Sequence, residues 1–188
     1  MRALITGSTE RVEALSKAFE RAGSQAVTLA DMGPGCAAVD CYVQLGFTVP
    51  ARGDTVVRRV RSFLSDGLLE RFAIVERVLP LLADSATVLL VTGNQSSESA
   101  APDDHAARLM ILRVLAHAIR ADRADQAPRH TWVRVISDDR TDAELVEFAT
   151  SGQKDPTTIP PGVSDEIVGG ASYQDWRTEV MGLFQVEV

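Results

Sequence analysis

The chain has 188 residues, 45% of them hydrophobic, and a formal net charge of −7 at pH 7. This length predicts one domain over residues 1–188, with enough chain to bury a core. The acidic charge argues against a nucleic-acid partner and against binding to an anionic membrane surface.

No stretch of the sequence has the roughly 18 consecutive apolar residues that a membrane-spanning helix needs. The first residues also lack the apolar segment of a secretion signal, so we expect a cytoplasmic protein without a membrane partner. Cys36 and Cys41 are too few for a disulfide framework or a four-ligand zinc site. We expect both thiols to be reduced and buried, and to lie in one strand on its opposite faces.

The first half of the chain contains three short β-rich runs and one amphipathic segment. A buried strand over 3–6 leads into a turn at Gly7, and apolar residues at helical spacing predict a helix that stops at Gly23. A second strand is predicted over 25–31, and a third ends at Gly46. The link between these two strands is shorter than the dozen or so residues of a helical parallel crossover. No additional βα unit therefore fits between them.

The second half continues the alternation of strands and helices. The expected elements, in chain order, are a helical region over 53–82 that bends near Gly67, a strand over 86–93, a helix over 103–122, a strand over 130–137, helices over 140–151 and 173–182, and an edge strand over 183–188. Residues 152–170 are rich in proline and glycine and predict an irregular surface segment. The whole pattern is typical of an α/β fold in three layers, with a mostly parallel sheet of about six strands.

Five segments between Arg2 and Ser137 carry a resemblance to one enzyme family. In order they are "LITGST", "DCYVQLGF", "ERFAIVERVLPLLADSATVLLVTGN", "HAARLMILRVLAHAI" and "WVRVIS". Their order resembles the motifs of the short-chain dehydrogenase/reductase (SDR) family, which are Rossmann enzymes that use NAD(P). The resemblance implies a Rossmann-like fold, shortened by the loss of a βα segment after the second strand.

The cofactor turn of the SDR family reads T-G-x-x-x-G-x-G. Here Gly7, Ser8 and Thr9 would form the matching turn, but the later glycines fall on Arg11 and Glu13. Those glycines let the backbone approach the pyrophosphate, and a carboxylate at a helix N-terminus competes with phosphate for the same N–H groups. The departures therefore argue against NAD(P) binding of the kind the family uses.

The family's catalytic serine, tyrosine and lysine align with Gly93, Ala101 and His105. Alanine has no proton to transfer, so the resemblance implies that the proton-transfer chemistry is lost. Asp31 stands where an acid often binds the ribose hydroxyls of NAD; the alternative is that it caps a turn at the end of a strand. His105 and His117 point in different directions on one predicted helix and cannot share a metal ion, so we expect no metal site.

Two predicted helices are apolar on more than one face, although a helix on a sheet needs only one apolar stripe. The side chains in question are Leu68, Phe72, Val75, Leu109, Leu112 and Ile119. The SDR family forms its dimers through the equivalent helices. We therefore expect a homodimer through helices at about 58–82 and 103–121, or a heteromer with an intact SDR. The alternative is that the C-terminal part of the same chain covers these faces.

These features together predict a non-catalytic SDR-like protein that acts as a binding or assembly partner and holds no cofactor. The alternative is an atypical oxidoreductase that binds NAD or NADP through non-standard residues. A third interpretation is unrelated chemistry near residues 93–105, because loops at the carboxyl ends of parallel strands commonly bind ligands.

Overall fold

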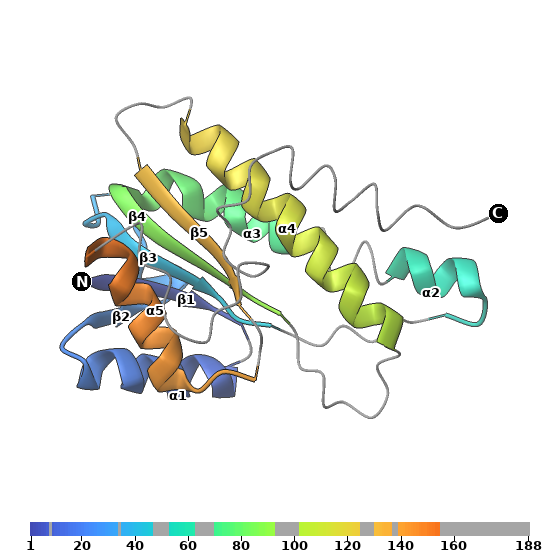
Figure 1. The fold of residues 1–188 in the computed structure, drawn as a ribbon, viewed down its shortest axis with the longest axis horizontal. Coiled ribbons are helices and arrows are strands. Elements are labelled where there is room, and N and C mark those ends of the chain that lie inside the picture. Colours follow the sequence, from blue (N-terminus) through green and yellow to red (C-terminus); the bar gives the residue numbers. More distant parts are fainter. Residues whose placement is uncertain are drawn as a thin grey trace.

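The protein has an α/β fold in which a five-stranded parallel sheet is flanked by helices on both faces (Figure 1). The structure is a computed structural model, which describes residues 1–7, 9–33, 35–46, 53–62, 70–92, 102–124, 130–136 and 139–154. The strands are β1 (Arg2–Thr6), β2 (Gln25–Val27), β3 (Val39–Gln44), β4 (Leu82–Val91) and β5 (His130–Ile136), and the helices are α1 (Thr9–Arg21), α2 (Val56–Ser62), α3 (Glu70–Val78), α4 (Pro102–Ala124) and α5 (Asp142–Lys154), with 3-10 turns η1 (Leu29–Asp31) and η3 (Leu79–Leu81).

The strands lie in the order β2-β1-β3-β4-β5, and every neighbouring pair is parallel. This order is that of a Rossmann sheet without the strand beyond β2, and flavodoxin-like sheets share it. The predicted three-layer, Rossmann-like fold is therefore confirmed. The sixth strand, predicted over 183–188, and the irregular segment 152–170 fall mainly or wholly outside the described residues, which end at Lys154.

Alternating side chains along the strands form two separate cores. One core lies between the sheet and helices α3 and α4, and the other lies between the sheet and helices α1 and α5 (Figure 1). In β3, for example, Tyr42 belongs to the first core, whereas Cys41 and Val43 belong to the second. Because successive side chains of a strand point to opposite faces, both faces of this sheet are apolar, and a layer of helices packs on each.

The link between β2 and β3 is short and carries no α-helix in its described part. β2 ends at Val27, four residues before the predicted end of the strand, because the chain turns into η1. β3 then pairs with β1 instead of β2. No βα unit is inserted here, as the length of the link predicted.

The two cysteines do not share a strand, contrary to the prediction. Cys36 precedes β3 and is exposed, and its Sγ lies 3.2 Å from the backbone nitrogen of Gly33. Cys41 lies within β3 and is buried, and this burial raises the pKa of its thiol. The strand begins only at Val39, and Cys36 lies before it, where its backbone nitrogen donates to the carbonyl of Gly33 at 3.2 Å.

The predicted helical region 53–82 is divided between α2, α3 and η3, and residues 63–69 between the helices are outside the described part. β4 starts at Leu82, four residues earlier than predicted, and pairs there with Val39. None of the described helices combines the length and the apolar content that crossing a bilayer requires.

Candidate functional site at the carboxyl edge of the sheet

The carboxyl ends of β1 and β3 lie side by side at the point where the chain changes direction. Thr6 and Gln44, the last residues of the two strands, are paired in register. The chain continues from β1 into α1 on one face of the sheet, whereas the helix after β3 that contacts the sheet, α3, lies on the other face. In open α/β sheets, ligands bind outside the carboxyl ends of the strands at such a switch point.

A chain of polar side chains occupies this edge, on the face covered by α3. The hydroxyl groups of Thr6 and Tyr42 are 2.9 Å apart. The amide nitrogen of Gln44 donates to the Tyr42 hydroxyl at 3.2 Å and to the backbone carbonyl of Arg71 at 3.2 Å. Because Arg71 lies in the first turn of α3, these bonds fix the start of that helix against the ends of β1 and β3.

Three members of this polar chain are almost fully buried: Tyr42, Gln44 and Arg71 are 1%, 1% and 2% exposed. The guanidinium group of Arg71 donates to the carbonyl of Val91, at the end of β4, over 3.5 Å. The side-chain oxygen of Gln44 is buried and has no hydrogen-bond partner among the residues that the structure describes. Such an oxygen costs about 1–3 kcal/mol of stability, so it marks a place where the fold tolerates a polar group that it does not satisfy.

Burial raises the pKa of Tyr42 to about 12, against a smaller lowering effect of its hydrogen bonds with Thr6 and Gln44 and of the Arg71 charge. The phenol is therefore neutral throughout the physiological range. It can donate or accept a hydrogen bond at the carboxyl edge, but a phenol with this pKa is a poor base.

Gly7, in the turn after β1, is required by packing. Its φ is +150°, and a Cβ atom placed there would lie 2.6 Å from Cβ of Leu45. Leu45 is held at this position because its backbone nitrogen donates to the carbonyl of Thr6 at 2.8 Å. A glycine at this turn is thus explained by the close approach of two strand ends, without any phosphate. Ser8 lies outside the described residues, and Thr9 is the exposed first residue of α1.

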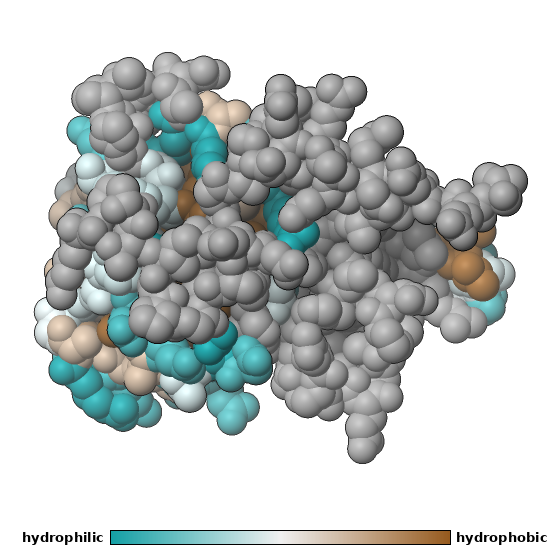
Figure 2. All heavy atoms as spheres, in the orientation of Figure 1, coloured by the Kyte–Doolittle hydropathy of each residue, from teal (hydrophilic) through white to brown (hydrophobic). Residues whose placement is uncertain are grey.

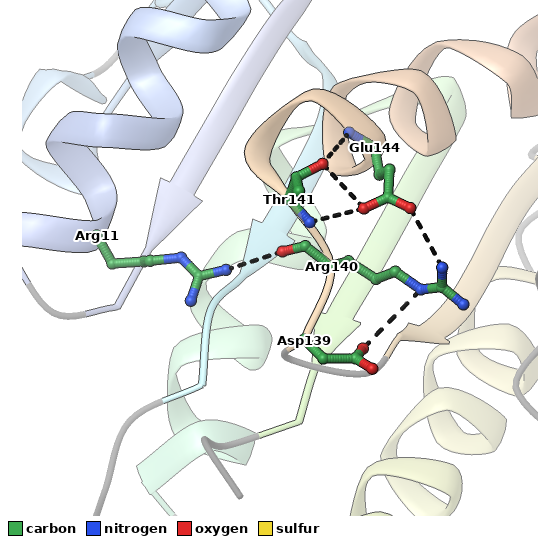
Figure 3. Close-up of polar contacts among 5 residues, drawn as sticks. All are labelled: Arg11, Asp139, Arg140, Thr141 and Glu144. Carbon is green, nitrogen blue, oxygen red and sulfur yellow. Dashed lines mark hydrogen bonds and ion pairs between the residues drawn. The ribbon is translucent and has the colours of Figure 1, made fainter. Parts of the chain in front are cut away.

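Arg11, which stands where the SDR family has its second glycine, reaches across to the start of α5. Its guanidinium group lies 3.5 Å from the carbonyl oxygen of Arg140 (Figure 3). It also lies 3.7 Å from the carboxylate of Asp142. Both ionic partners are about one-third exposed. The side chain therefore links the first turns of two helices that pack side by side on the same face of the sheet.

The acidic group in the first turn of α1 is Glu10, not Glu13. Glu13 is the fifth residue of the helix and is exposed, so it is too far along to act on the terminal N–H groups. The prediction that Glu13 competes with phosphate is corrected in this respect, because the helix starts at Thr9 and places Glu10 closer to its N-terminus.

The first turn of α5 carries a reciprocal cap that the same view shows (Figure 3). The backbone nitrogen of Thr141 donates to Glu144 at 2.8 Å, and the backbone nitrogen of Glu144 donates to the Thr141 hydroxyl at 3.3 Å. Arg140 adds a bond of 3.2 Å to the same carboxylate. The backbone bond from Thr141, more than any other contact, lowers the pKa of Glu144.

Asp31 caps a local turn, which was the alternative to its binding a ribose. Its carboxylate accepts hydrogen bonds from the backbone nitrogen of Thr28 at 2.7 Å and from the Thr28 hydroxyl at 2.8 Å. The backbone bond is the main cause that lowers the pKa of Asp31. Among the described residues, no cluster of three histidine, cysteine, aspartate or glutamate side chains could hold a metal ion.

The side chains predicted to form an intersubunit interface lie largely inside the chain. Val75, Leu112 and Ile119 are 3%, 0% and 1% exposed and belong to the core between α3, α4 and the sheet. Phe72 is partly buried against the same core. The predicted faces of α3 and α4 therefore contact the sheet of their own chain, because one apolar stripe was enough to cover it.

The remaining predicted positions fall outside the described part of the structure. Leu68, Gly93 and Ala101 belong to segments that the structure does not describe. His105 and Leu109 lie in α4, but their side chains are likewise outside the described ones.

Sequence reasoning did not find the group formed by Tyr42, Gln44 and Arg71. Tyr42 and Gln44 are polar residues near the end of a strand, and Arg71 is one of four charged residues in an amphipathic helix. Each is a weak signal alone, and only their positions in the fold bring them together.

No protein-family model, curated protein or solved structure matches this chain. The resemblance to the SDR family therefore rests on the five sequence segments and stays a prediction.

Proposed function

We propose that this chain is a non-catalytic, SDR-like protein that acts as a binding or assembly partner and does not bind NAD(P) as that family does. The observation that carries the proposal is the position of Arg11. Its side chain stands in the first turn of α1 and is held by Arg140 and Asp142 at the start of α5.

A dinucleotide of the family type needs the backbone N–H groups of this turn at close range. An arginine side chain prevents the close approach that a glycine permits. Its positive charge would attract phosphate, but the carboxylate of Asp142 lies 3.7 Å away and offsets that charge. The carboxylate of Glu10 in the same turn opposes an incoming phosphate as well.

Tyr42, which lies at this edge, does not have the properties of a catalytic tyrosine. A catalytic tyrosine of the SDR type requires a lowered pKa, whereas burial raises that of Tyr42. Its hydroxyl group already bonds to Thr6 and to Gln44. These contacts support a structural role for Tyr42 and, with it, the non-catalytic proposal.

One observation favours the alternative, an atypical oxidoreductase that binds NAD or NADP through other residues. The side-chain oxygen of Gln44, which has no partner within the described part of the chain, lies at the switch point of the sheet, where a ligand N–H group could bond to it. This candidate ranks second because Gln44 is 1% exposed, so a ligand would have to displace the groups that cover it.

Titration of the purified protein with NADH and with NADPH, followed by nucleotide fluorescence and by calorimetry, separates the two proposals. We expect no saturable binding of either nucleotide. Saturable binding in the micromolar range would overturn the first proposal, and its loss in Gln44→Leu would then assign the site to the polar edge. An intact SDR enzyme titrated in parallel verifies that the assay detects binding.

A further inference from the structure

We draw no further inference here: the strongest candidate, the exposed hydrophobic patch of Val56 and Val57 on α2 at one end of the molecule (Figure 2), carries none because nothing in the described part of the structure shows what covers it.

Discussion

The residues at the carboxyl edge of the sheet are determined by close packing and burial. Gly7 adopts a φ of +150° and has no space for a side chain beside Leu45. Tyr42 and Gln44 are enclosed under α3 and make their hydrogen bonds within the chain. These residues therefore contribute to stability in ways that single substitutions can measure.

Gly7→Ala should destabilise the protein by about 1–3 kcal/mol, because the added Cβ must displace Leu45 and the backbone conformation is unfavourable for alanine. Thermal or urea unfolding measures the loss. Gly33→Ala is the matched control, since nothing lies within 4 Å of the position that its Cβ would take. Equal stability of Gly7→Ala and the wild type would contradict the packing explanation.

Tyr42 should make the stability fall at high pH. Its pKa is raised from 10.0 to about 12 in the folded protein, so above pH 10 the unfolded chain loses a proton that the folded chain keeps. The free energy of unfolding should then decrease between pH 10 and 12. Denaturant unfolding of the wild type and of Tyr42→Phe tests this, because Tyr173 remains in both proteins. Tyr42→Phe should cost about 1 kcal/mol at neutral pH and show a smaller decrease above pH 10; parallel pH profiles would disprove the assignment.

The helices on the two faces of the sheet are anchored by different means. α1 and α5 meet through Arg11, and α5 starts with the reciprocal cap of Thr141 and Glu144. α3 instead starts with a buried arginine and a bond from Gln44. The first set is partly exposed, so its contribution can be removed without opening a core.

Thr141→Ala should lower the stability by about 1 kcal/mol, the usual cost of losing an N-cap. Thr141→Ser keeps a hydroxyl acceptor and should retain most of the stability. The pKa of Glu144 is lowered in the folded state, so its contribution is present above the ordinary pKa of a glutamate and is lost as the pH falls through the lowered one. Unfolding curves at neutral and acid pH measure both effects, and an alanine variant as stable as the serine variant would rule out the cap.

At the scale of the whole molecule, the described elements form a three-layer core with helices on both faces of one parallel sheet. The core faces of α3 and α4 are occupied by their own sheet, so association through them would require the fold to open. The expected outcome at this scale is that neither NADH nor NADPH binds saturably to the folded chain.

Several features could be predicted from the sequence because their causes are local. The alternation of apolar strands and amphipathic helices predicted the α/β fold and its parallel sheet, and the short link after Asp31 predicted that no extra βα unit lies there. The ends of elements were less accurate: the second strand stops at Val27 because Asp31 bonds back to Thr28 and closes a turn. At the candidate site, the sequence showed that Gly7 and Arg11 occupy the turn after the first strand. It did not show that Gly7 packs against Leu45 or that Arg11 contacts the start of α5.

The sequence by itself determined the layers of this protein, because the two-residue and 3.6-residue periods of apolar side chains dictate which elements form and that they must cover a sheet. Only the tertiary structure decided which face of α3 and α4 is buried, where Arg11 points, and that Gln44 meets Arg71, 27 residues away. The physical reason is that a period specifies a stripe along one element. The partner of each side chain depends on how elements distant in sequence pack together.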